Sequence, residues 1–287
     1  STTVTITIAA GQGPVAGSDS SLSVNEGALA PNGSGVHLTP DVATTQVSFT
    51  AGADDLHVTL NASALTTLLA GFPNLVWTTA AGGQEIVGTQ NGVTVVKFDI
   101  TAGATIAAGT TGQVTVTETL LAAIQGEGSK SPDLGTLNVV ATDTLNGGSV
   151  TDHITANVVD DHPTANPDTA TAQDGGPAVT VLTGNVASVM ANDVSGADTP
   201  INVTAVVATS NGNLAGTVGT ALTGEFGKLT LNADGTFSYT ANHNVLVGSK
   251  DVFTYTITDD DGTTSSTTQT TTNAAGTGPG PGRRSSP

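Results

Sequence analysis

One stretch divides the chain, Val159-Asp160-Asp161-His162-Pro163-Thr164-Ala165-Asn166-Pro167-Asp168. An alternating segment ends here in two adjacent carboxylates, and two prolines follow. Proline fixes its own φ and pushes the preceding residue toward extended backbone, so the stretch indicates a short linker between domains. We therefore expect one domain at residues 1–161 and a second at 162–272. Residues 273–287, rich in Gly and Pro without periodicity, are expected to be a disordered or artificial tail.

On both sides of the linker, Val, Ile and Leu alternate with Thr, Ser and Asn. Such period-two runs predict half-buried strands, as at residues 4–8, 56–60, 93–98, 201–206 and 252–257. Only 3% of residues are aromatic and 37% are hydrophobic, which suits thin cores of short stacked strands. The predicted fold class is all-β, with two tandem β-sandwich domains joined by a short Pro-containing linker. Two brief segments, 63–70 and 118–124, are compatible with a helix.

The charge of the chain is strongly acidic, with 24 Asp and Glu against 6 Lys and Arg, a net charge of −18. Nucleic acid is therefore not expected as a partner, because phosphate binding needs a basic surface. No segment has the pattern of a signal peptide or of a transmembrane helix, so we expect no membrane insertion. Together with the start at Ser1, this favours a fragment or export without an N-terminal signal. Acidity by itself also maintains solubility.

The absence of Cys excludes disulfides, so a small secreted domain would need another source of stability, such as a bound metal. Acidic residues gather where predicted strands end: Glu26 in an early loop, Asp143 after a late strand, and Asp160 with Asp161 after the last one. We expect loops at one end of the first sandwich to bring these four together at the junction. Ca²⁺ prefers six to eight oxygen ligands. Each Asp alone also fits a turn cap, but the pair beside the prolines favours calcium.

These motifs resemble known repeats. The closing run Val-Val-Asp-Asp-His-Pro at 158–163, with Glu26 and Asp143, is similar to the calcium pattern of cadherins. It resembles more closely the tandem repeats of bacterial RTX adhesins, which are type I secretion substrates. In the second domain, Asn-Asp-Val-Ser-Gly-Ala-Asp at 192–198 and Asp-Gly-Thr-Phe at 234–237 resemble bacterial cadherin-like and VCBS-type modules. The resemblance is close over 165–270 and rests mainly on the closing motif over 1–164.

The resemblance implies Ig-like or cadherin-like β-sandwich modules in the stalk of a large secreted adhesin at the bacterial cell surface. Their role would be structural, extending the protein in support of cell adhesion or biofilm formation. The implied cofactor is Ca²⁺, and the implied partners are neighbouring repeat modules of the same polypeptide. Host or surface glycans or proteins would be bound through other domains. The implied metal ligands are Glu26, Asp143, Asp160, Asp161, Asp168, Asp193, Asp198, Asp259, Asp260 and Asp261.

The sequence also bears on two function classes other than a structural one. No enzyme is expected, because the five His residues are scattered and no Gly-x-Ser-x-Gly motif occurs. The alternative is a glycan or peptide site in the loops of 53–130, which include the only Trp, Trp77; core packing is its simpler explanation. The second domain holds four of the nine aromatic residues in two alternating runs, and we expect them to form its core.

Overall fold

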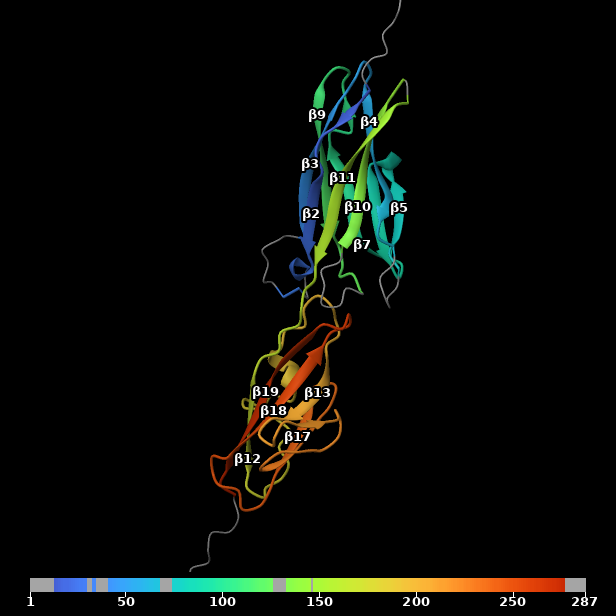
Figure 1. Cartoon of the computed structure of the whole chain (residues 1–287). Helices are drawn as coiled ribbons and strands as arrows, with labels where there is room; N and C mark the ends of the chain where they lie inside the picture. Colours follow the sequence, from blue (N-terminus) through green and yellow to red (C-terminus); the bar gives the residue numbers. More distant parts are fainter. Residues whose placement is uncertain are drawn as a thin grey trace, which may run out of the picture. The chain divides into compact units, whose positions relative to one another are not determined.

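The computed structural model describes residues 13–29, 33–34, 41–67, 74–125, 133–145 and 147–276. Two compact units divide the chain, residues 1–161 and 162–287, and each has its own hydrophobic core. Both units consist of strands (Figure 1), which confirms the all-β fold class. The helical elements of the described residues are three short 3₁₀ helices, η1 Glu26–Ala28, η2 Ala81–Gly83 and η3 Val189–Asn192. The expected strand at 4–8 and most of the expected tail lie outside the described residues.

Unit 1 is a sandwich of two sheets, ordered β1-β3-β9-β7-β6-β5 and β2-β11-β10-β4-β8. All neighbouring strands are antiparallel except β2 and β11, which pair parallel. The bounds are β1 Val15–Ala16, β2 Ser20–Asn25, β3 Val42–Thr50, β4 Leu56–Leu65, β5 Val76–Ala80, β6 Glu85–Gln90, β7 Val93–Ala102, β8 Thr105–Ile106, β9 Thr111–Leu120, β10 Asp133–Asp143 and β11 Ser149–Val159. Side chains of both sheets form one core.

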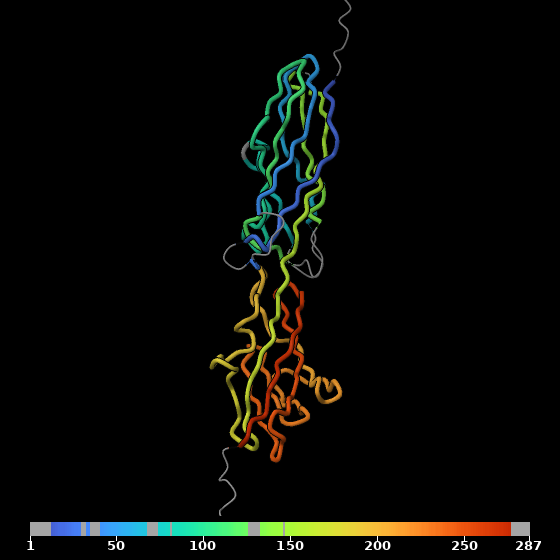
Figure 2. The backbone as a smooth tube through the Cα atoms, turned by 90° about the vertical axis from the view of Figure 1, so that its left-hand side faces the viewer, coloured from blue at the N-terminus to red at the C-terminus, as the bar shows by residue number. Residues whose placement is uncertain are grey.

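Unit 2 also consists of two sheets, ordered β12-β19-β18-β13-β14 and β15-β16-β17. Its first strand pairs parallel with its last, and the other pairs are antiparallel. The bounds are β12 Asp168–Gln173, β13 Asn202–Ala208, β14 Leu214–Gly216, β15 Leu222–Thr223, β16 Gly227–Leu231, β17 Phe237–Ala241, β18 Lys250–Thr258 and β19 Thr264–Ala274. The backbone of both units can be followed in Figure 2.

The alternating pattern determines which side chains reach the cores. In β18, Phe253, Tyr255 and Ile257 point inward and are fully buried. Tyr239 of β17 packs edge-on against Phe253, with ring centroids 6.2 Å apart. Phe237 is also buried, so the expected aromatic core of the second domain is confirmed.

The two segments compatible with a helix contain strand instead. The strand β4 continues to Leu65 and β9 continues to Leu120, and both residues are buried on the inward face. In β9 the period-two alternation persists to Leu120, whereas in β4 a bulge shifts the alternation before Leu65; both segments still pair in sheets and do not coil. Residues 68–70, the end of the first segment, lie outside the described residues.

Candidate metal-binding carboxylates

Two acidic side chains meet at one end of unit 1. Because β2 and β11 run parallel, they end together, with Asn25 paired to Val159. Glu26 is the next residue after β2, and Asp160 is the next after β11. Glu26 is 0% and Asp160 7% exposed, and their carboxylate oxygens lie within 4.8 Å of each other. The parallel pairing thus brings together two of the four residues expected to converge.

Hydrogen bonds hold the surrounding loops in place. The Glu26 Oε1 atom accepts a bond of 2.7 Å from the backbone N–H of Ile124. Asp161, also buried, accepts bonds from the N–H of Ser34 at 2.8 Å and from its hydroxyl at 2.5 Å. These bonds fix carboxylates in a buried setting, where an isolated negative charge is costly. The acidic side chains at this end offer only carboxylate oxygens as metal ligands, which is the ligand chemistry that Ca²⁺ prefers.

The expected convergence of Asp143 with these residues is wrong. β10 and β11 form a hairpin, in which Asp133 pairs with Asn157 and Thr142 with Ser149. Asp143 therefore lies at the opposite end of the sheet from Asp160. The eleven residues of β11 separate the two ends by roughly 30 Å at about 3.3 Å per residue. The carboxylate of Asp143 caps the hairpin turn, accepting a bond of 2.9 Å from the N–H of Leu145.

In unit 2, Asp168 and Asp193 lie on either side of the Tyr255 hydroxyl. The hydroxyl is 2.9 Å from Asp168 Oδ2 and 3.2 Å from Asp193 Oδ2. The backbone N–H of Asn166 donates to Asp193 at 2.7 Å. Burial, partly offset by Tyr255, raises the pKa of Asp168 to about 6, and burial also raises the pKa of Asp193. Burial and then Asp168 raise the pKa of Tyr255, so the hydroxyl keeps its proton and donates it to a carboxylate.

A second pair of carboxylates lies in the turn between β18 and β19. Asp259 and Asp261 are buried, whereas Asp260 between them is exposed. Both accept the backbone N–H of Thr263, at 2.7 and 3.0 Å, and the Thr263 hydroxyl donates to Asp259. Burial, and then its hydrogen bond with Asp261, raises the pKa of Asp259 to about 7. Asp261 Oδ2 is buried and has no hydrogen-bond partner among the described residues.

Asp198 lies in the segment between η3 and β13 and is 3% exposed. The ten expected ligands therefore fall into several places. Glu26 and Asp160 meet, with Asp161 next in the chain; Asp168 and Asp193 share Tyr255; Asp259 and Asp261 share Thr263. Asp143 lies apart at the opposite end of its sheet, and Asp260 is turned to solvent.

Three further buried acids were not expected from the sequence, Asp152 of β11 and the two described next. Asp251 of β18 accepts bonds from the Tyr239 hydroxyl at 2.8 Å, the Ser210 hydroxyl at 3.0 Å and the N–H of Glu225 at 2.7 Å. Glu118 of β9 is 0% exposed, and neither of its carboxylate oxygens has a hydrogen-bond partner in the described part of the chain. Burial raises the pKa of Glu118 to about 8. Both residues lie on the inward face of an alternating strand, which is a signal visible in the sequence.

A family model described as the bacterial Ig domain matches residues 160–272. The matched segment begins with Asp160, includes the whole of β12–β18 and ends within β19. The two sheets of this segment, in which most strand pairs are antiparallel, agree with an Ig-like or cadherin-like module. No curated protein matches the chain.

Several solved structures are similar in outline. The cadherin-like domains 1 to 4 of zebrafish RET align with 13% identity over 91% of this chain and 51% of that chain, with a TM-score of 0.29. Drosophila N-cadherin EC1-4 aligns with 13% identity over 92% and 49%, with a TM-score of 0.27. The titin domains z1z2 in complex with telethonin align with 11% identity over 93% and 98%, with a TM-score of 0.34. The chain thus spans about half the length of the two cadherin-like structures. TM-scores this low establish no shared fold. The fold of this chain is assigned from its strand topology alone.

None of the helices in the described part of the chain has the length and hydropathy of a membrane-spanning helix.

Proposed function

We propose that this chain is a structural extender from the stalk of a large secreted bacterial surface adhesin. Ca²⁺ held where one unit passes into the next would stiffen it, in support of cell adhesion or biofilm formation. The match of residues 160–272 to the bacterial Ig domain supports the proposal, because such domains are typically extracellular and structural. The net charge of −18 fits a protein whose acidic side chains bind a hard cation. Export by type I secretion belongs to the same proposal.

The observation that carries the proposal is the meeting of Glu26 and Asp160. Two buried carboxylates within 4.8 Å of each other repel when both are ionised, and a cation removes that repulsion. Asp160 and Asp161 are also the last residues of unit 1, immediately before the backbone enters unit 2. A cation bound to Glu26 on one loop and to Asp160 on another would restrict the backbone at this link.

The acidic turn of unit 2 offers further ligands. Asp261 Oδ2 is a buried oxygen with no hydrogen-bond partner in the described residues, and Asp259 lies beside it with a raised pKa. Two carboxylates that share few donors fit a divalent cation, which would supply the missing positive charge. Asp168 and Asp193 are weaker candidates, because the Tyr255 hydroxyl already donates between them.

Thermal unfolding of the full chain in Ca²⁺, in Mg²⁺ and in EDTA tests the proposal. Trp77, the only Trp, reports unit 1, whereas both Tyr residues lie in unit 2. A site saturated a hundredfold above its Kd adds about 2.7 kcal/mol, and each kcal/mol raises Tm by about 2–4 °C in a domain of this size. We therefore expect Ca²⁺ to raise the Tm of unit 1 by roughly 5–10 °C relative to EDTA.

Matched variants locate the site. Asp160→Asn and Glu26→Gln should each abolish most of the Ca²⁺-dependent rise, because each removes one ligand charge without changing side-chain size. Asp143→Asn, at the opposite end of the same sheet, should leave the rise unchanged. Equal melting in Ca²⁺ and EDTA, or an equal loss in Asp143→Asn, would refute calcium binding at this end of unit 1.

Stiffening of the link between the two units by Ca²⁺ is measured separately from stability. The chain has no Cys, so a pair of spin labels can be placed at Thr101→Cys in unit 1 and Asn202→Cys in unit 2, both exposed. Ca²⁺ should narrow the distribution of distances between the labels. A distribution that stays equally broad, in a protein whose Tm has risen, would show that calcium stabilises the domain without bracing the junction.

A further inference from the structure

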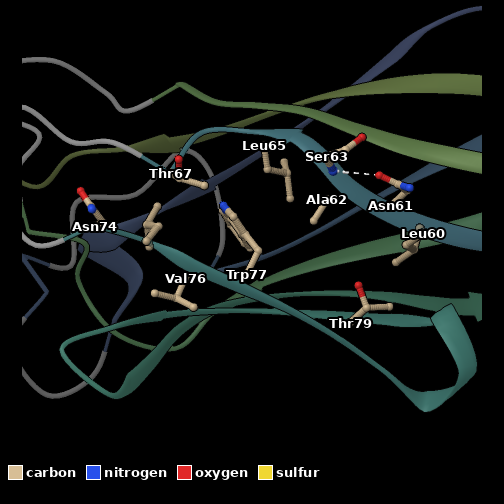
Figure 3. Close-up of a pocket in the computed structure, with 11 residues that line it drawn as sticks. Leu60, Asn61, Ala62, Ser63, Leu65, Thr67, Asn74, Val76, Trp77 and Thr79 are labelled. Carbon is tan, nitrogen blue, oxygen red and sulfur yellow. Dashed lines mark hydrogen bonds between the residues drawn. The ribbon is translucent and has the colours of Figure 1, made fainter.

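A groove runs along one edge of unit 1, between strand β4 of one sheet and strand β5 of the other (Figure 3). Its volume is about 770 Å³, and Trp77 lies in it. The eleven residues that line it carry hydroxyl, amide or apolar side chains and no charge: Leu60, Asn61, Ala62, Ser63, Leu65, Thr67, Asn74, Leu75, Val76, Trp77 and Thr79. An uncharged groove in a chain of net charge −18 suits an uncharged ligand.

The Trp77 ring is half-buried, packs against the core of unit 1 and is held by two further contacts. Its Nε1 atom donates to the backbone carbonyl of Thr66 at 2.7 Å, and Phe98 packs against it with ring centroids 5.9 Å apart. Gly88 lies directly opposite on β6, where an added Cβ would come within 2.6 Å of the indole. A glycine at position 88 therefore leaves room for the ring. A ring fixed before binding loses little entropy when a ligand stacks on it.

The polar side chains lie around this ring. Figure 3 shows Trp77 between the two strands, with Ala62 and Leu65 of β4 near it and the amides of Asn61 and Asn74 farther out. Both Asn residues are exposed. An apolar, aromatic surface with a few exposed amide and hydroxyl groups fits a sugar ring, which presents C–H groups on its faces and hydroxyls around its edge.

On its β4 side, this groove suits an extended peptide less well than a glycan. A peptide that adds to a sheet needs a regular strand edge with free backbone groups. The pairing of β4 with β10 is interrupted by a bulge between Thr136 and Asn138, opposite the groove residues. The backbone N–H of Ser63 already bonds to Asn61 Oδ1 at 2.8 Å. Bulges of this kind disrupt the ladder and make the β4 edge a poorer template for pairing.

We infer that the groove between β4 and β5 is a binding site for a neutral oligosaccharide, with Trp77 as the stacking platform and Asn61 and Asn74 as hydrogen-bonding groups. This activity is independent of calcium and goes beyond the structural role proposed above. It would place a recognition site on the stalk itself, in the first of the two units.

Because Trp77 is the only Trp in the chain, its emission reports occupancy of the groove directly. The full chain is titrated with cellohexaose, maltohexaose, laminarihexaose and chitohexaose, in Ca²⁺ and again in EDTA, and heparin hexasaccharide provides the anionic comparison. We expect a saturable change in emission with at least one neutral sugar, in both Ca²⁺ and EDTA. No response to any neutral sugar, or a response to heparin alone, would overturn the proposal.

Variants at the groove then place the ligand. Asn61→Ala and Asn74→Ala each remove an exposed amide and should weaken binding about fivefold, the value of one hydrogen bond of about 1 kcal/mol. Asn202→Ala, an exposed Asn in unit 2, is the matched control and should bind as the wild type does. Unchanged affinity in both groove variants would show that the sugar binds elsewhere and would overturn the assignment.

Discussion

Glu118 is a carboxylic acid in the middle of a hydrophobic core, and its removal should change how unit 1 responds to pH. It lies on the inward face of β9 between Val116 and Leu120, both buried. Across the sheet it pairs with Ala43 and Phe98. Burial alone raises its pKa from 4.5 to about 8, and no nearby charge contributes to the shift. The side chain is therefore protonated in the folded protein at neutral pH.

The raised pKa of Glu118 determines whether unit 1 gains or loses stability as the pH rises. The unfolded chain releases the proton near pH 4.5, whereas the folded chain keeps it until about pH 8. Stability from this group is fully present below pH 4.5 and is lost as pH rises through 8, because the unfolded state binds fewer protons in that range. A gap of this size corresponds to about 4–5 kcal/mol. Glu118→Leu, which preserves volume and removes the acid, should abolish this loss and stabilise unit 1 most strongly at the alkaline end.

Urea unfolding followed by Trp77 emission measures unit 1 alone, since unit 2 has no Trp. The free energy of unfolding is compared at several pH values from 4.5 to 8 in wild type and in Glu118→Leu. Burial also raises the pKa of Asp152 in the same unit, so the difference between the two proteins isolates Glu118. An identical pH slope in both proteins would refute the assignment of Glu118 as a buried, protonated acid.

Tyr255→Phe should lower the stability of unit 2 by about 1–3 kcal/mol in calorimetry, because it removes the donor between two buried carboxylates. Asp251→Asn should cost a similar amount in both Ca²⁺ and EDTA, followed by Tyr absorbance, since the amide cannot accept all the donors that the carboxylate accepts. Asp261→Asn should instead stabilise unit 2 in EDTA and lose that gain in Ca²⁺, in the same assay. Gly88→Ala should lower the stability of unit 1 by about 1–3 kcal/mol and shift Trp77 emission, because the added methyl group would overlap the indole.

Alternation in the sequence was sufficient to predict the sheets and the aromatic core of unit 2. Phe253 and Tyr255 alternate with threonines, and their burial follows from the pleat of a single strand. Alternation also marked Glu118 as an inward residue, because Val114, Val116 and Leu120 share its parity. The helix-compatible pattern of 118–124 hid that signal, although the pairing of β9 with β3 and β7 determines the structure.

The positions of the acids relative to one another were harder to predict, because they depend on strand direction. Asp143 and Asp160 both follow strands, and their positions in the sequence look equivalent. The hairpin between β10 and β11 places them at opposite ends of the sheet, whereas the parallel pairing of β2 with β11 brings Glu26 to Asp160. Recognising the short β10–β11 connection as a hairpin would have been enough to predict that Asp143 lies at the opposite end of the sheet from Asp160. The parallel pairing, by contrast, joins segments about 130 residues apart and left no local signal.

The donors around each buried acid indicate which ones are structural. The carboxylate of Asp251 accepts bonds from two hydroxyls and from the backbone N–H groups of Glu225 and Phe226. These four donors replace the hydrogen bonds that water would make to the carboxylate. Asp259 and Asp261 together share the N–H and hydroxyl of Thr263 and one further N–H, that of Gly262. Two negative charges with few donors are costly to bury unless a proton or a cation joins them. A proton does so only near or below the raised pKa of Asp259, about 7. At or above neutral pH the proposed Ca²⁺ would be the better partner, so we expect this turn to be ordered by calcium and Asp251 to be ordered without it.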